Sequence, residues 1–399
     1  MSRTAMDHSD RSQRHFFSRL LPSWEMGLNR PSAVRPARRY NGRSGGKMSR
    51  SVFVRVGLSL LAIGGASGCA ARLKLAYAPD ELRAEVARRA PSLAPQEVLV
   101  PFELTREAVE RAQRAVQRAR STEGQVRLLV EAMAEGGPLA VRYQAGATLT
   151  AEEALQTSVG DCTALASLFI GLARSVGLTA YYSDASSRMH ETRFGDDGMA
   201  VNSGHITAVV ENGPEMIGLD FAGLGRSRWY RVIDDVEALA HFYNNRGFDL
   251  IDDAHERSRP VDWAAAARQF EMATQVMPGF ARAWNNLGIA AGHLGQVQQA
   301  IQHYRTAIAA DPKFAAPYNN LGSLYLRIGN GAAALEVLTR AAQLESTAPH
   351  VQYNLALARL GQGDRSGAIE AARKAIELRK DYPDAQAFLE KLGEAPSKR

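Results

Sequence analysis

The sequence predicts an α+β domain followed by an all-α superhelix of repeats. Helical patterns dominate residues 70–178, and short strand-like runs follow them up to residue 233. From about residue 240 the same residue types recur every 34 positions. A block of helices and then of strands is typical of an α+β domain, whereas a fixed period of this length indicates stacked helical repeats. With 399 residues, both parts can have cores of their own.

The α+β part begins with helices. Segments rich in Ala, Arg, Glu and Leu predict helices over 78–89, 105–120 and 123–134. Thr150 and Glu153 form a capping box, so a short helix is expected over 151–156. A longer helix begins near Asp161, carries one apolar face and ends at Gly177.

Four strands are predicted next, over 179–183, 206–210, 216–221 and 229–233. Asn212 and Gly213 favour a two-residue hairpin loop between the second and third of these strands. With that loop, the register places His205 opposite Asp220. Directly opposite side chains on one face of a sheet have Cβ atoms about 5 Å apart. The turn therefore predicts an imidazole beside a carboxylate.

The repeats are defined by columns of identical residues 34 positions apart. These columns are Leu287, Leu321 and Leu355; Gly295, Gly329 and Gly363; Ala300, Ala334 and Ala368; Ala307, Ala341 and Ala375. The best copy reads Trp284-x2-Leu287-Gly288 and then Ala300-x3-Tyr304, which is the tetratricopeptide (TPR) pattern.

An earlier, longer copy precedes these repeats. Its Asn245 stands 41 positions before Asn286, so we expect about seven extra residues in the turn of the first repeat. We expect the polar residues of that turn to form a solvated surface; they are Asp252, Asp253, His255 and Glu256.

Cys162, His205 and Asp220 have the residue types and order of a thiol nucleophile, its base and the group that orients the base. Cys162 lies in the first turn of a helix, where the partial positive charge is expected to lower the thiol pKa. Backbone amides of that turn could stabilise an oxyanion, with Gln156 as a candidate second donor. A buried structural thiol is the alternative, because free cysteines are commonly core residues.

These segments carry a resemblance to a known family. Thr150–Gln156, Gly160-Asp161-Cys162 with the apolar helix after it, and the His205 and Asp220 segments resemble the core of the transglutaminase-like superfamily over roughly 120–235. The resemblance implies a papain-like fold with a Cys-His-Asp triad. Bacterial members include proteases, amide hydrolases, cross-linking enzymes and inactive relatives. The aromatic residue often found two positions after the histidine is Thr207 here, which leaves the substrate pocket open.

The formal net charge of +6 comes from the start of the chain. The first 68 residues carry 12 basic and 3 acidic side chains, whereas residues 69–399 carry 36 basic and 39 acidic ones. Nucleic-acid binding requires basic charge on the folded surface. We therefore exclude nucleic acid as a primary partner.

Residues 48–68 resemble a bacterial lipoprotein signal. Two arginines precede the apolar stretch 56–63, which is too short to span a bilayer, and small residues lead into Cys69. In such a signal Cys69 is lipidated and becomes the mature N-terminus, so a periplasmic, membrane-anchored protein is expected, with the outer membrane as the favoured site. An ordinary secretory signal cleaved nearby is the alternative. Residues 1–47 lack apolar periodicity and are either disordered or untranslated.

Asparagines form a further column of the repeats. Asn286, Asn320 and Asn354 are 34 positions apart, and Asn245 is the shifted equivalent. An amide side chain offers donors and an acceptor, so a ladder of them can pair with a peptide backbone whatever its side chains. Some TPR proteins hold peptides in this way. The alternative is that these asparagines only cap contacts between repeats.

We therefore expect a leader over 1–68, N-terminal helices with the transglutaminase-like domain over 69–237, and about four TPR repeats over 238–399. The expected function is thiol acyl transfer, with protein or peptide substrates bound by the repeats. An inert adaptor lipoprotein is the alternative. No cofactor or metal is expected, because the polar loop that contains His190, Glu191, Asp196 and Asp197 lacks ligand spacing.

Overall fold

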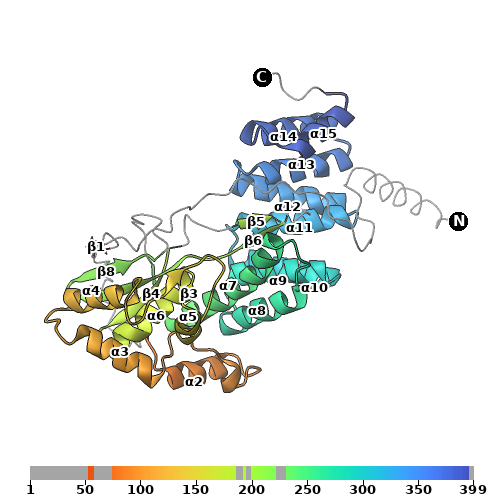
Figure 1. The fold of residues 1–399 in the computed structure, drawn as a ribbon. Helices are drawn as coiled ribbons and strands as arrows, with labels where there is room; N and C mark the ends of the chain where they lie inside the picture. Colours follow the sequence, from red (N-terminus) through yellow and green to blue (C-terminus); the bar gives the residue numbers. More distant parts are fainter. Residues whose placement is uncertain (1–52, 58–73, 186–191, 195–198, 222–230, 395–399) are drawn as a thin grey trace, which may run out of the picture. The chain divides into compact units, whose positions relative to one another are not determined.

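The computed structural model describes residues 53–57, 74–185, 192–194, 199–221 and 231–394 (Figure 1). The chain divides into two compact units. The mixed unit comprises Gly42–Thr192 and Asn202–Ala283, and the described residues of the repeat unit come from Arg193–Val201 and Trp284–Arg399. The predicted fold class is confirmed, since a mixed α/β region at 104–233 is followed by an all-helical TPR array at 235–391.

The mixed unit is built on a five-stranded sheet with the order β1-β8-β7-β4-β9. All of its strand pairs are antiparallel. The strands are β1 (Phe53–Gly57), β4 (Ala180–Asp184), β7 (Ile206–Asn212), β8 (Glu215–Leu219) and β9 (Arg231–Ile233). Each of the four strands predicted from the sequence is present, and β1 adds an edge strand from the predicted leader.

The β7–β8 hairpin turns one residue later than predicted. Asn212 pairs with Glu215, so the loop consists of Gly213 and Pro214, and the register places Ala208 opposite Leu219. A loop of Asn212 and Gly213 would make Pro214 a hydrogen-bonded strand residue, and proline has no N–H to donate. Gly213 instead takes the first loop position with φ +64°, where glycine is favoured.

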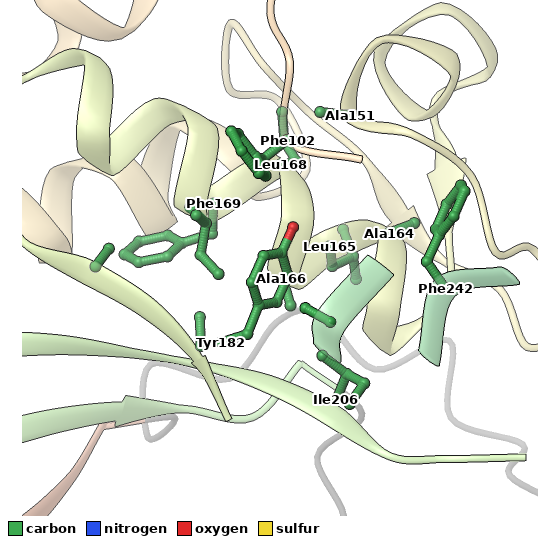
Figure 2. Close-up of a cluster of buried hydrophobic side chains, with 14 of the residues drawn as sticks. Phe102, Ala151, Ala164, Leu165, Ala166, Leu168, Phe169, Tyr182, Ile206 and Phe242 are labelled. Atoms are coloured by element: carbon green, nitrogen blue, oxygen red, sulfur yellow. The ribbon is translucent and has the colours of Figure 1, made fainter. Parts of the chain in front are cut away.

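One helix, α6 (Cys162–Ser175), lies at the centre of the mixed unit and packs against β4 and β7. Its residues from Cys162 to Ala173 are all buried. Figure 2 shows Leu165 and Phe169 of this helix with Tyr182 of β4 and Ile206 of β7. The Tyr182 hydroxyl donates to Ser167 Oγ at 2.9 Å, which satisfies a polar group inside this core.

The helices of the mixed unit before α6 are α2 (Pro79–Arg89), η1 (Pro95–Glu97), α3 (Arg106–Val116), α4 (Thr122–Met133) and α5 (Ala151–Thr157). A short parallel pair joins β2 (Arg142–Tyr143) to β3 (Val159–Gly160), directly before α6. Of these elements, α3, α4, α5 and β3 pack against α6. A second small pair joins β5 (Thr192–Phe194) to β6 (Ala200–Asn202), and most of its residues belong to the repeat unit.

The first repeat consists of α7 (Asp235–Glu256) and α8 (Trp263–Val276), which pack against each other in the mixed unit. Its extra residues are not confined to the turn, as the sequence had suggested, because α7 itself continues to Glu256. The predicted solvated residues Asp252, Asp253, His255 and Glu256 are therefore helical, and Asp252 is buried.

The later repeats stack as helix pairs in the repeat unit, where Figure 1 shows α11 to α15 in blue. The helices after α8 are α9 (Ala281–His293), α10 (Val297–Ala310), α11 (Ala315–Arg327), α12 (Gly331–Leu344), α13 (Pro349–Gly361), α14 (Arg365–Leu378) and α15 (Pro383–Lys391). Close packing between paired helices explains why Gly288 of α9 and Gly322 of α11 have no side chain. A Cβ at Gly288 would lie 2.7 Å from Tyr304, and one at Gly322 would lie 2.4 Å from Leu338. In the described part of the chain, no helix has the length and apolar character required to span a membrane.

Candidate active site

The local fold places Cys162 at the first position of α6. Asp161 is the N-cap, and its side chain accepts from the Ala164 N–H at 2.8 Å. Gly160 precedes it in β3, where a Cβ would lie 2.8 Å from Ala164 Cβ, so the chain can enter the helix here only without a side chain. Cys162 is buried, with 9% of its surface exposed.

His205 and Asp220 come together at the same end of the β7–β8 hairpin. His205 directly precedes β7 and Asp220 directly follows β8, and both are buried. Nε2 of His205 lies 3.1 Å from Oδ1 of Asp220. The predicted neighbourhood is therefore present, although the register differs by two residues. A shift of two keeps both side chains on the same face of the sheet, so the pair still meets.

The thiol lies beside this pair. Both the ring of His205 and the Ile206 backbone N–H are near enough to the Cys162 sulfur to lower the pKa of the thiol. Because Nε2 faces Asp220, Nδ1 is the ring nitrogen available to the thiol. The structure thus brings together all three residues that the sequence proposed for a triad.

The surroundings of the site raise the pKa of both the base and the nucleophile. Burial lowers the pKa of His205, but its hydrogen bonds to Asp220 and Cys162 outweigh burial and raise that pKa to about 10. Burial raises the pKa of the Cys162 thiol, and the Asp161 carboxylate raises it further, against the lowering effect of His205. The thiol and the imidazole are therefore coupled, because each shifts the pKa of the other in favour of the charged pair.

The expectation of a lowered thiol pKa is thus wrong, because burial raises the pKa of the Cys162 thiol and the neighbouring Asp161 raises it further. The N–H groups of Thr163 and Ala164 donate to the Asp161 carboxyl group and lower its pKa, but burial outweighs these bonds and raises that pKa overall. Thr148 continues this network, since its hydroxyl donates to Asp161 at 2.7 Å and its N–H donates to Asp249 at 2.8 Å.

Asn245 is adjacent to this site, although the sequence assigned it to peptide binding. Its Oδ1 accepts from the Gly204 N–H at 2.9 Å, and its Nδ2 donates to the Gly204 carbonyl at 3.0 Å. The same Nδ2 donates to Thr163 Oγ1 at 3.0 Å. Asn244 donates to the Asn202 carbonyl at 3.1 Å. The partner of Asn245 is thus a backbone, as predicted, but it is the backbone of this chain.

In the repeat unit, Asn320 pairs with the backbone of Ala200 in the same way. The Ala200 N–H donates to Asn320 Oδ1 at 3.0 Å, and Asn320 Nδ2 donates to the Ala200 carbonyl at 3.1 Å. Asn285 also donates to this carbonyl at 3.1 Å and accepts from Asn320 at 2.8 Å. The Tyr304 hydroxyl lies 3.5 Å from Met199 Sδ. These groups therefore hold an internal peptide segment.

The other predicted ladder residues have side-chain partners. Asn354 Nδ2 donates to Asn319 Oδ1 at 2.9 Å, and Asn286 Oδ1 accepts from Asn285 at 3.2 Å. These bonds match the alternative of contacts within and between repeats. The sequence signal that was missed is the asparagine directly before Asn286 and before Asn320, because Asn285 and Asn319 also take part.

Several predicted residues lie outside this constellation. Gln156 is exposed on α5, and its role as an oxyanion donor stays a prediction. Cys69 and the polar-loop residues His190, Glu191, Asp196 and Asp197 lie outside the described residues. Within the residues that are described, no group of three or more His, Cys, Asp or Glu side chains is arranged to hold a metal ion.

Family models match both parts of the chain. Residues 104–211 match the transglutaminase-like superfamily, a range that contains Cys162 and His205 and ends before Asp220. A TPR repeat model matches residues 293–329, and a tetratricopeptide repeat model matches 319–383 and 353–395. The chain therefore contains a transglutaminase-like core domain followed by TPR repeats. Among curated proteins, none matches the sequence.

Solved structures with some likeness include two that are described as TPR proteins. MamA from Desulfovibrio magneticus, residue 41 to the end, is 21% identical with a TM-score of 0.34, over 39% of this chain and 83% of that one. YrrB, described as a TPR protein with an unusual peptide-binding site, is 16% identical with a TM-score of 0.32, over 39% and 80%. The first TPR of Spaghetti (RPAP3), bound to an HSP90 peptide, is 22% identical with a TM-score of 0.28, over 29% and 90%.

Proposed function

We propose that this protein is a thiol acyl-transfer enzyme. Within this class, we propose a cysteine amidase or protease rather than a cross-linking enzyme. The observation that carries the proposal is the meeting of the buried Cys162 thiol with His205, whose Nε2 lies 3.1 Å from Asp220. The match of residues 104–211 to the transglutaminase-like superfamily supports the same chemistry. The order of the three groups is that of nucleophile, base and orienting carboxylate.

In the proposed reaction, the Cys162 sulfur attacks the carbonyl carbon of an amide. The thiol proton is taken up by Nδ1 of His205, which must first release a proton because the raised pKa favours the imidazolium at rest. The tetrahedral intermediate collapses as the imidazolium gives a proton to the leaving amine. Water then attacks the thioester, with His205 as base, and releases the acid and the free thiol. An amine in place of water would give transamidation.

The first turn of α6 supplies the oxyanion donor in this proposal. Thr163 and Ala164 direct their N–H groups to Asp161, and Leu165 donates to the Asp161 carbonyl. The N–H of Cys162 is then the group of this turn that can serve a developing oxyanion. Gln156 remains the candidate for the second donor.

We further propose that the mature protein is anchored by a lipid on Cys69 at the periplasmic face of the envelope, with the outer membrane favoured. Its TPR repeats would bind a protein or peptide partner. A peptide that used Asn285 and Asn320 would have to displace Ala200, whose backbone they hold. We therefore place the partner on surfaces of the repeats other than these two asparagines.

The test is acylation by an activated ester such as p-nitrophenyl acetate. In a Cys69→Ser background, Cys162 is the only cysteine of the chain, so intact-protein mass spectrometry reports its acylation directly. We expect a transient acetyl-enzyme that Cys162→Ala abolishes. His205→Ala should slow its formation by about 10²- to 10⁴-fold. Asp220→Asn should retain more activity than His205→Ala, because it misorients the imidazole without removing it. Adding a primary amine distinguishes hydrolysis from transamidation by the product formed.

The second candidate is an inert adaptor that binds proteins through its repeats. Two observations favour it, namely the burial of the Cys162 thiol and its raised pKa. The same experiment decides between the two functions. A folded protein whose Cys162 reacts no faster than in the His205→Ala variant would establish the adaptor and contradict the enzyme.

A further inference from the structure

The Asn245 side chain has used all of its hydrogen-bonding capacity. A carboxamide offers two acceptor positions and two donors. Its oxygen accepts from the Gly204 N–H and from Asn244 Nδ2, and its nitrogen donates to the Gly204 carbonyl and to Thr163 Oγ1. Only 2% of Asn245 is exposed. Its geometry is therefore fixed by four bonds in a buried setting.

Both residues that Asn245 ties together are neighbours of the proposed catalytic groups. Gly204 directly precedes His205, and Thr163 directly follows Cys162. The two backbone bonds to Gly204 fix the position of the chain that enters β7. The bond to Thr163 links this segment to the first turn of α6. One side chain thus spans the two segments whose separation sets the distance between thiol and imidazole.

The helix that carries Asn245 is itself held firmly. A Cβ at Gly247 would lie 2.5 Å from the Phe270 ring, so α7 sits directly on α8. At its start, Asp235 accepts two bonds of 2.8 Å from the Arg174 guanidinium at the far end of α6. The first repeat is therefore bonded to α6 near both ends of α6, through Arg174–Asp235 and through Thr163–Asn245.

We propose that Asn245 is a positioning residue for the thiol–imidazole pair, so that the first TPR repeat is a working part of the active site. This inference rests on the proposed function. The role of Asn245 is geometric, because a neutral amide adds no charge to the site. Its loss would leave the Gly204 N–H and carbonyl without partners and would free the His205 segment to shift relative to α6.

The experiment measures Cys162 acylation by p-nitrophenyl acetate in the full chain with Cys69→Ser. We expect Asn245→Leu to slow acylation by an amount close to that of His205→Ala, about 10²- to 10⁴-fold. We also expect the Asn245→Leu/His205→Ala double variant to be no slower than His205→Ala within about twofold, because both changes remove the same function. Thr163→Val removes only the bond to α6 and should give a smaller fall.

Controls separate positioning from general destabilisation. Gln352→Leu also removes a buried amide that donates to a backbone carbonyl, that of Ser346 at 3.2 Å in the repeat unit, and should leave acylation unchanged. Thermal unfolding identifies variants that fold. If Asn245→Leu does not fold, Thr163→Val decides, and full activity there overturns the inference. A folded Asn245→Leu variant that acylates at the parent rate also overturns it. If His205→Ala itself has no effect, the proposed function has failed instead.

Discussion

At the scale of single residues, the most informative side chain is the N-cap of the nucleophile helix. Asp161 stabilises α6 by accepting from its first amides, but its carboxylate lies beside the sulfur that has to become an anion. Helix stability and thiolate formation therefore make opposite demands on this position. The balance can be measured by changing the charge and keeping the cap.

We expect Asp161→Asn to lower the apparent pKa of Cys162. Asparagine is an N-cap of similar quality, so the helix should persist while the negative charge is removed. The rate of iodoacetamide alkylation of Cys162, measured from pH 6 to 10, reports the thiolate. The parent chain should show a midpoint above the ordinary thiol value of about 8.5, and the variant a lower one. A midpoint that stays the same would mean that Asp161 does not act on the thiol.

Asp249 predicts a pH dependence of stability. Burial raises its pKa to about 8, with the neighbouring Asp161 as the next cause, whereas an unfolded aspartate has a pKa of about 3.9. Between about pH 4 and pH 8 the folded chain therefore holds a proton that the unfolded chain has released. This contribution to the free energy of unfolding is present at low pH and is lost as pH rises through 8.

Urea unfolding at several pH values measures this contribution. Asp249→Asn keeps an acceptor for the Thr148 N–H but cannot titrate. In the parent, the free energy of unfolding should fall with rising pH over this range, by at most about 1.4 kcal/mol per pH unit from this group. The variant should lack this fall. Equal slopes in parent and variant between pH 5 and 7 would contradict the raised pKa.

The residue types of the site could be predicted from the sequence, but their environment could not. Cys162, His205 and Asp220 each lie in a recognisable local context, so their order and approximate proximity followed from helix and hairpin signals. The role of Asn245 depends on contacts 41 and 82 residues away in the chain, with Gly204 and Thr163. The raised thiol pKa depends on burial, which no local pattern shows.

At the scale of elements, the hairpin shows how one residue changes a register. The sequence predicted both strands but placed the loop at the asparagine–glycine pair, whereas the missing N–H of Pro214 moved it onward by one residue. The helix boundaries were predicted closely where caps were visible, as at Thr150 and Asp161. The extension of α7 to Glu256 was missed because the 34-residue period assigned the extra residues to the turn, although Ile251 and Ala254 continue the buried face of the helix.

The ion pair between α6 and α7 should be essential for the stability of the mixed unit. The Asp235 side chain is fully buried and accepts two bonds from Arg174, of which 18% is exposed. Asp235→Ala leaves the Arg174 charge without its partner, and we expect a loss of about 3–5 kcal/mol in the free energy of unfolding. Urea denaturation measures it. Glu131→Gln, at an exposed pair with Arg127, is the control and should cost less than about 1 kcal/mol. Equal losses in the two variants would show that the buried pair has no special role.

At the scale of the whole molecule, the repeats are not simply a substrate-binding appendage. The asparagine column was predicted to bind peptides through their backbone, and Asn245 and Asn320 each hold a backbone by the expected donor and acceptor pair. The residues held, Gly204 and Ala200, lie just before His205 in the sequence. The sequence could reveal the binding chemistry of this column but not that its ligand is internal.

Processing at Cys69 would change the sheet as well as the N-terminus. The β1 strand lies before Cys69, so cleavage there would leave β8 as an edge strand of the mature sheet. We expect mass spectrometry of the protein isolated from membranes to find a mature chain that begins at a lipid-modified Cys69. Cys69→Ser should release the protein from the membrane fraction. A mature chain that retains residues 53–57, or an unmodified Cys69, would contradict the lipoprotein prediction.

The backbone bonds between Ala200 and Asn320 also have a consequence for biosynthesis. The two residues are 120 positions apart, and the chain is made from its N-terminus. At about 5–20 residues per second, roughly 6 to 24 seconds separate the synthesis of the held segment from that of its holder. During this interval the stretch leading to His205 lacks its partner in the repeats. The Ala200 segment therefore gains these bonds only after the repeat that contains Asn320 has been made.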